Sequence, residues 1–159
     1  MSFEQLFAGR RVDIQEIRHR LTGAAEAFGL PFRGSDRIYN SRLAQELGLW
    51  SASKDKGDEF HAAVFRAYFV DGRNIAAIPV LVELASSVGL AGDEAAAVLV
   101  TRTFKEAVDA DWALSRTRSI TAVPTFVMDQ DRLVGAQPYE ALEGLMQAHG
   151  VKRRVPQGG

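Results

Sequence analysis

The chain of 159 residues has the length of one domain, and its 47% hydrophobic and 25% charged residues are ordinary for a globular protein. A formal net charge of -1 gives no electrostatic reason to expect nucleic acid or an anionic membrane as partner. No apolar run is long enough to span a membrane and no apolar signal segment precedes Arg10, so we expect a cytoplasmic protein. The absence of cysteine excludes disulfides, zinc-thiolate sites and a cysteine nucleophile in this polypeptide.

Helical periodicity fills most of the chain. In chain order it predicts a short helix that ends near Gly9, helices over about 13–28, 40–50, 58–70, 79–88 and 93–118, strands over 125–128 and 132–135, and a helix over 138–150. The turn between the strands is expected at 129–131, and the residues 152–159 are expected to form a disordered tail.

Polar residues and prolines mark where several of these helices begin. Asp13 opens a capping box, Asn40 or Ser41 suits the cap of the next helix, and Asp93 suits the cap of a later one. Pro79 fits the first position of its helix, because its missing N–H is not needed there.

Two helices carry further expectations. The helix over 58–70 has a wide apolar arc around Phe60, Val64 and Tyr68, which predicts that it is the central helix of a bundle. The β-branched residues at 101–103 predict a kink, after which an apolar stripe runs inward as far as Trp112.

The junction around Pro124 organises the end of the chain. A proline cannot donate a hydrogen bond to a strand ladder, so the strand is expected to start at Thr125. A helix-to-strand bend that contains a proline is also a setting for a cis peptide bond, and we expect Val123–Pro124 to be cis.

At these residues the chain resembles DsbA-like thioredoxin-fold proteins, in particular the FrnE branch, which is related to 2-hydroxychromene-2-carboxylate isomerases and kappa glutathione transferases. The resemblance rests on four stretches of sequence: Tyr39–Gly48, Phe65–Ile75, Asp109–Ala113 and Val123–Phe126 with the following Gly135–Pro138. Members of this family usually open with a strand, then a helix whose N-terminus carries Cys-x-x-Cys or, in the isomerase branch, a serine, and then a second strand. None of these features is present in this sequence.

The predicted fold class is therefore mainly α with a C-terminal β-hairpin, as an incomplete thioredoxin-like α/β fold with a DsbA-type helical insertion. We expect a single domain over 1–151, with the helical insertion and its following helix over 13–118 and the proline loop, hairpin and last helix over 119–150.

The resemblance also implies where ligands bind. Family members use the backbone beside the cis-proline to hold an extended substrate or glutathione, which corresponds here to Val123, Pro124 and Thr125. The alternative is a turn retained for folding after the redox half was lost. Arg73 and Asn74 lie in a loop that faces the same cleft in the family, although a turn role suits Asn74 better.

Other polar clusters predict no chemistry. His19, His61 and His149 show no metal-site spacing, so we expect no metal, and no catalytic residue is predicted. Asp109 and Asp111 are two apart on a helix and point in different directions, and Lys105 with Asp109 has the spacing of a solvated ion pair.

Three functions remain open on the sequence. The first is a redox-inactive binding or assembly module, or a truncated oxidoreductase, of the thiol-disulfide oxidoreductase family, needing no cofactor. The second is a glutathione-dependent isomerase or transferase, in which glutathione supplies the thiol. The third is a purely structural helical protein. Since the hairpin lacks the strands that cover it in the family, we expect a homodimer formed through the hairpin and adjoining helical surface.

Overall fold

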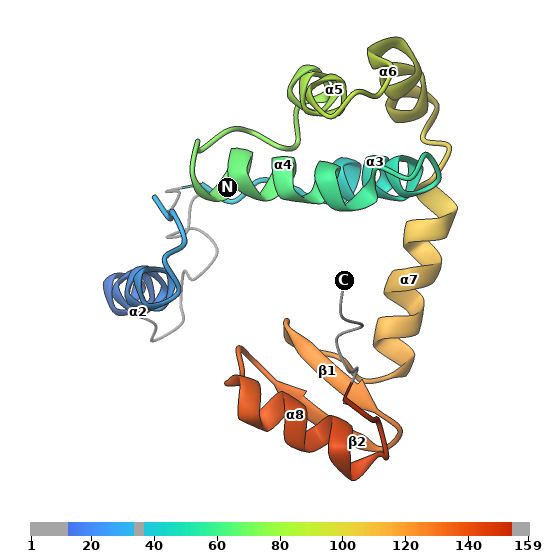
Figure 1. Ribbon diagram of the computed structural model, residues 1–159. Helices are drawn as coiled ribbons and strands as arrows, with labels where there is room; N and C mark the ends of the chain where they lie inside the picture. The colour runs from blue at the N-terminus through green and yellow to red at the C-terminus, as the bar shows by residue number, and fades with distance from the viewer. Residues whose placement is uncertain (1–12, 34–36, 154–159) are drawn as a thin grey trace, which may run out of the picture. The chain divides into compact units, whose positions relative to one another are not determined.

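The computed structural model describes residues 13–33 and 37–153 (Figure 1). Its elements are α2 (Ile14–Ala27), α3 (Arg42–Ala52), α4 (Gly57–Phe69), α5 (Ile78–Ser87), α6 (Gly92–Thr101), α7 (Lys105–Thr117), β1 (Thr125–Met128), β2 (Asp131–Val134) and α8 (Tyr139–Ala148). The predicted class, mainly helical with a C-terminal hairpin, is confirmed. The short helix expected near Gly9 and most of the expected tail lie outside the described residues.

The chain divides into two compact units between Asp109 and Ala110. We call them the helical unit and the hairpin unit. The division falls within α7, whereas the sequence placed the change to the C-terminal part at 118–119.

The centre of the helical unit is α3, which packs against α4, α5 and α6. The expectation that the helix over 58–70 would be central is wrong. That helix, α4, buries Phe60 and Ala67, but Phe65 and Phe69 beside them are 61% and 40% exposed. Its apolar arc is wider than the surface its neighbours cover, so width of the arc did not indicate a central position.

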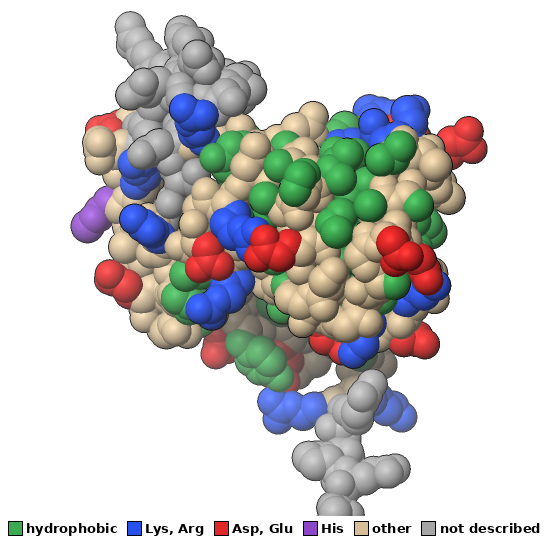
Figure 2. Space-filling model, turned by 90° about the horizontal axis from the view of Figure 1, so that it is seen from above, with side chains coloured by type: hydrophobic (Ala, Val, Ile, Leu, Met, Phe, Trp, Pro, Cys, Tyr) green, Lys and Arg blue, Asp and Glu red, His purple; other side chains and the backbone are tan. Residues whose placement is uncertain are grey.

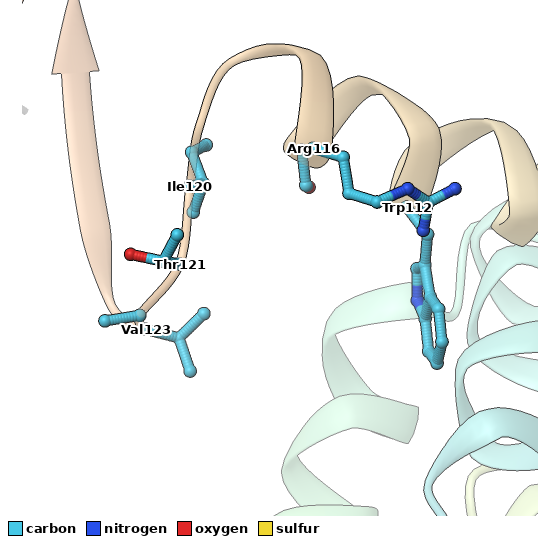
Figure 3. A pocket seen from close by; sticks show the side chains of 7 residues that line it. Trp112, Arg116, Ile120, Thr121 and Val123 are labelled. Atoms are coloured by element: carbon cyan, nitrogen blue, oxygen red, sulfur yellow. The ribbon is translucent and has the colours of Figure 1, made fainter.

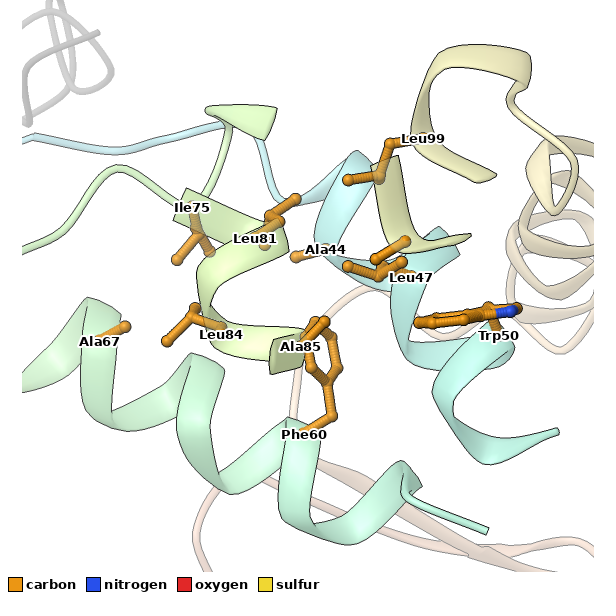
Figure 4. Packing of buried hydrophobic residues seen from close by; sticks show 11 residues of the cluster. Ala44, Leu47, Trp50, Phe60, Ala67, Ile75, Leu81, Leu84, Ala85 and Leu99 are labelled. Atoms are coloured by element: carbon orange, nitrogen blue, oxygen red, sulfur yellow. The ribbon is translucent and has the colours of Figure 1, made fainter. Parts of the chain in front are cut away.

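One apolar cluster holds these helices together (Figure 4). Its buried members are Ala44, Leu47, Trp50, Phe60, Ala67, Ile75, Leu81, Leu84, Ala85, Ala95 and Leu99. Burying each large apolar side chain contributes roughly 1.5–3 kcal/mol, so this cluster dominates the stability of the unit. On the outer side, Figure 2 shows hydrophobic side chains gathered over α5 and α6 between acidic and basic ones.

The observed N-caps of the helices agree with the predicted ones only in part. Asp13 caps α2 as predicted, because its Oδ1 accepts from the N–H of Gln15 at 2.8 Å and of Glu16 at 3.2 Å. The predicted cap at Asp93 is wrong: Ala91 is the N-cap of α6, and Asp93 lies in the first turn, where its charge favours the helix dipole.

Of two further starts, that of α5 differs by one residue and that of α3 is confirmed. Pro79 is the second residue of α5 rather than the first. Ser41 is the N-cap of α3 without a side-chain cap bond, while Asn40 Oδ1 accepts from the N–H of Arg42 at 2.9 Å.

The kink expected at 101–103 is a full break between α6 and α7. Arg102 adopts the left-handed conformation, with φ 56° and ψ 38°. A non-glycine residue rarely occupies this region without compensation. Here its guanidinium donates two hydrogen bonds to the Glu46 carboxylate, Nε to Oε2 at 2.7 Å and Nη2 to Oε1 at 2.6 Å.

Glu46 is the centre of an ionic network that the sequence did not reveal. Its side chain is fully buried, and it also accepts from Arg42 Nε at 2.9 Å. Arg42 in turn contacts Asp109, which pairs with Lys105 Nζ at 2.8 Å as the spacing predicted. The network ties α3 to the break after α6 and to the first turns of α7.

These contacts lower the pKa of both acids, Glu46 and Asp109. The hydrogen bonds from Arg102, and then those from Arg42, lower the pKa of Glu46 against the opposing effect of burial. Hydrogen bonds from Lys105 and Arg42 lower the pKa of Asp109 to about 2. Both carboxylates are therefore ionised at neutral pH.

In the hairpin unit, β1 pairs antiparallel with β2 from Thr125 opposite Val134 to Met128 opposite Asp131. The second strand begins one residue earlier than predicted, and the turn is the two residues Asp129 and Gln130. Asp129 has φ 50°, which an aspartate tolerates better than most residues. A two-residue turn fits the twist of a hairpin more closely than the three-residue turn we expected.

None of the described residues from 110 to 153 is buried. The α8 helix lies along the hairpin (Figure 1), and its C-cap residue His149 contacts the turn through both ring nitrogens, Nδ1 to Asp129 at 3.0 Å and Nε2 to Asp131 at 3.1 Å. This contact and the ladder hold a unit that has no apolar core of its own among the described residues.

Candidate functional site

One edge of the hairpin is open. The N–H of Gly135 donates to the carbonyl of Pro124 at 2.8 Å, which fixes which residues of the ladder are hydrogen-bonded. Because bonded and non-bonded pairs alternate in an antiparallel ladder, Phe126 faces β2, and Thr125 and Val127 point their N–H and C=O groups outward. These outward groups have no hydrogen-bond partner in the described part of the chain.

The opposite edge, along β2, is less receptive. The outward carbonyl of Val134 accepts from Gln137 Nε2 at 2.7 Å, and the strand carries the charged residues Asp131 and Arg132. Charges on an edge discourage pairing with another strand. The strand β1 carries no charge, so it is the edge that favours strand addition.

The segment directly before β1 is the loop for which the resemblance implied a ligand. The Val123–Pro124 peptide bond is cis, as the sequence predicted. The Val123 side chain is 88% exposed, and Thr125 Oγ1 donates to the carbonyl of Ala122 at 2.6 Å. The structure thus presents Val123 to solvent beside the open edge.

A cavity of about 340 Å³ lies between this loop and the second half of α7 (Figure 3). Its lining residues are Trp112, Ser115, Arg116, Ile120, Thr121, Ala122 and Val123. Trp112 and Arg116 project from α7, one turn apart, and the remaining apolar wall comes from the loop. The size is that of a small-ligand or side-chain pocket.

Trp112 corrects one expectation. The apolar stripe of α7 predicted it inward, and Val108 on that stripe is buried, but Trp112 is 44% exposed. Its ring lines the cavity instead. The spacing of Trp112 and Arg116 in the sequence was the signal that could have revealed this wall.

Arg116 is the one charged residue that lines the cavity. It makes no ion pair or side-chain hydrogen bond to a described residue, whereas Arg132 donates to the carbonyl of Ser119 and Arg153 pairs with Glu143. A guanidinium has the charge and geometry that bind a carboxylate.

Arg73 and Asn74 have intramolecular partners. The Arg73 guanidinium binds the Glu83 carboxylate through two nitrogens, Nη1 at 3.1 Å and Nη2 at 2.5 Å, and Asn74 Oδ1 accepts from the N–H of Ala76 at 3.0 Å. Asn74 thus has the turn role that the sequence favoured. Both residues belong to the helical unit and the proline loop to the hairpin unit, so their shared cleft stays a prediction.

The helical unit holds a second cavity, of about 450 Å³, that the sequence did not predict. Aromatic side chains form much of its wall, among them Tyr39, Phe65, Tyr68 and Phe69. Burial, and then the nearby Tyr39, raises the pKa of Tyr68, whose hydroxyl therefore stays protonated.

His19, His61 and His149 are the histidines of the chain. No group of three metal-ligating residues gathers within 13–33 and 37–153. His149 lies between two aspartates, but these oppose different nitrogens of its ring and so do not converge on one ion. Among the described helices, none is long and apolar enough to cross a membrane.

Comparison with known proteins agrees with this geometry. The family model of the DSBA-like thioredoxin domain matches residues 5–147. The chain belongs to this family. That its helical unit corresponds to the helical insertion of the family stays a prediction; its hairpin unit carries the loop before β1.

Several solved structures are similar in fold. The probable DsbA oxidoreductase SCO1869 from Streptomyces coelicolor is 28% identical with a TM-score of 0.82, over 98% of this chain and 70% of that one. The cytosolic disulfide reductase DsbM from Pseudomonas aeruginosa is 23% identical with a TM-score of 0.60, over 85% and 75%. DsbM has also been solved with GSH.

Among curated proteins, the uncharacterised YwbO of Bacillus subtilis is 36% identical over 102 residues, which are 64% of this chain and 51% of YwbO. The chain thus spans about half the length of the curated relative it matches.

Proposed function

We propose that this chain is a redox-inactive binding module of the DSBA-like family that takes up an extended polypeptide as an added strand. The open edge of β1 carries the proposal, because two outward N–H and C=O pairs, at Thr125 and Val127, lack partners in the described part of the chain. Val123 and Pro124 lie directly before this edge. The hairpin has no buried residue, so an added strand also supplies cover that the unit lacks.

The related oxidoreductases work through thiols, and this chain has none. Thiol-disulfide exchange begins when a thiolate attacks a disulfide sulfur and forms a mixed disulfide. With no cysteine in the sequence, the binding step can occur here without the exchange step. Where this chain is part of a longer oxidoreductase, the same edge pairs with a strand of the part that carries the cysteines.

We expect no disulfide reductase activity from the chain. In an insulin-reduction assay with dithiothreitol, its rate should equal the rate of the blank, because no side chain can form the thiolate. A cysteine-free protein of similar size is the control. A rate clearly above that control would show that chemistry other than protein thiol exchange is present.

We expect a labelled β-forming peptide to bind and the substitution Val127→Pro to weaken that binding at least about tenfold. The proline removes an outward N–H from the open edge and leaves the β1–β2 ladder intact, because Val127 does not donate to β2. Fluorescence anisotropy at a protein concentration where the chain is monomeric measures the Kd.

The matched control is Val134→Pro, which removes an outward N–H from the opposite edge. It should bind the peptide like the unaltered chain. Equal weakening by both prolines would mean that the substitutions act through the stability of the hairpin, and unchanged binding in both would place the peptide elsewhere. Circular dichroism checks that each variant remains folded.

Glutathione is the alternative ligand. It is a short peptide, and the backbone of Val123 and Thr125 can hold it in the manner the resemblance implies. Saturable heat on calorimetric titration with glutathione, together with turnover of an aromatic isomerase substrate, would favour the glutathione-dependent class. Binding of longer peptides without glutathione binding would favour the module proposed above.

The cytoplasm is the compartment we propose. The relative DsbM is named as a cytosolic reductase. Fractionation of cells that produce the chain from its own gene measures the location.

A further inference from the structure

The polypeptide bound at this edge has a recognisable chemistry, and the inference rests on the proposed function. The cavity next to the β1 edge combines an apolar wall with one cation. We propose that the chain selects extended peptides that carry a large apolar side chain beside an acidic residue, with the apolar side chain in the cavity and the carboxylate on Arg116.

The position of the cavity supports this assignment. Val123 lines it and stands two residues before Thr125, the first residue of the open edge. A strand that pairs with Thr125 and Val127 and continues past Thr125 runs on beside Val123, advancing about 3.3 Å for each residue. One of its side chains then reaches the hollow between the loop and α7.

The lining decides what fits there. Trp112, Ile120, Ala122 and Val123 offer apolar surface, and the exposed Trp112 ring and Val123 side chain gain burial when a large apolar group enters. Ser115 and Thr121 complete the lining.

The charge of Arg116 determines which peptide residue is preferred next to the apolar side chain. Arg116 is the one ionic group in the lining, and no described carboxylate neutralises it. An acidic residue next to the apolar anchor forms a charge-assisted hydrogen bond with the guanidinium, while a basic residue at that place is repelled. Charge complementarity therefore separates acidic peptides from others of equal hydrophobicity.

The test compares three labelled peptides of one β-forming sequence with phenylalanine at the centre. They differ only in the next residue, which is glutamate, glutamine or lysine. We expect the unaltered chain to bind the glutamate peptide about tenfold more tightly than the glutamine peptide, as one charge-assisted contact implies, and the lysine peptide least tightly. The preference should shrink at high salt.

Two variants test whether Arg116 is the residue that binds the peptide carboxylate. Arg116→Glu should abolish the preference for glutamate and favour lysine, whereas Arg118→Glu, an exposed neighbour outside the lining, should leave the order of the peptides unchanged. An unchanged order in Arg116→Glu, or equal affinities of the three peptides for the unaltered chain, overturns the inference while strand binding stands. Failure of all three peptides to bind overturns the proposed function as well.

Discussion

Light scattering coupled to size-exclusion chromatography is expected to give the mass of two 17.4 kDa chains at micromolar protein concentration. An isolated two-stranded ribbon is marginal in water, and the hairpin unit buries none of its described residues. Phe126 and Met128 alternate with Thr125 and Val127, so both faces of β1 carry apolar groups.

The exposed apolar side chains make pairing favourable. Val123 is 88%, Phe126 37% and Val134 52% exposed. Each large apolar side chain left in water forfeits roughly 1.5–3 kcal/mol, so a few of them rival a total stability of about 5–15 kcal/mol. Two hairpins related by a two-fold axis can join their β1 edges into a four-stranded antiparallel sheet, because such an interface is self-complementary.

Two proline variants test which edge pairs. Val127→Pro on the β1 edge should yield the mass of one chain, and Val134→Pro on the β2 edge should leave the dimer intact. A peptide that binds the β1 edge should also shift the mass toward one chain, since it competes for the same groups. A well-folded species of one-chain mass in the unaltered protein at micromolar concentration would contradict the dimer.

The second large effect concerns the ionic network. Glu46→Ala is expected to lower the free energy of unfolding by about 3 kcal/mol, because removing one partner of a buried ion pair leaves the others uncompensated. Arg102 loses its carboxylate, although it is 39% exposed and can partly return to water, and Arg42 is left with Asp109 as its carboxylate partner. Urea unfolding followed by circular dichroism measures the change.

The matched control is Glu83→Ala within α5, which removes an exposed carboxylate that also binds an arginine, Arg73. Its cost should stay below about 1 kcal/mol, as for surface ion pairs. Similar losses in the two variants would mean that the burial of Glu46 adds nothing.

The same network predicts the pH dependence. A carboxylate with a lowered folded-state pKa contributes stability above its ordinary pKa, and that stability is lost as the pH falls through the folded value. For Glu46 and Asp109 the loss begins below 4.5 and 3.8 and, for Asp109, extends to about 2. Glu46→Ala should therefore show a flatter fall of stability with acid than the unaltered chain, and parallel curves would exclude Glu46 as a contributor.

The sequence alone determined the element types and the order in which they occur. Helical periodicity and the Asp13 cap are local signals, since a cap side chain bonds N–H groups two and three residues away. The proline at the start of β1 is also local, because a missing N–H restricts Pro124 wherever the chain folds. The absence of cysteine excludes thiol-disulfide exchange by this polypeptide.

The tertiary structure decided everything that depends on distant partners. Glu46 and Arg102 are 56 positions apart, and no spacing rule joins them. Tertiary contacts also decided that α3, rather than α4, is the central helix of the helical unit. The number of neighbouring helices determines which helix is covered, and the width of its apolar arc does not. At the site, the family resemblance in the sequence indicated Val123, Pro124 and Thr125. The cavity wall of Trp112 and Arg116 depends on how the folded loop lies beside α7. The outward direction of the Thr125 and Val127 backbone groups depends on the register of β1 against β2.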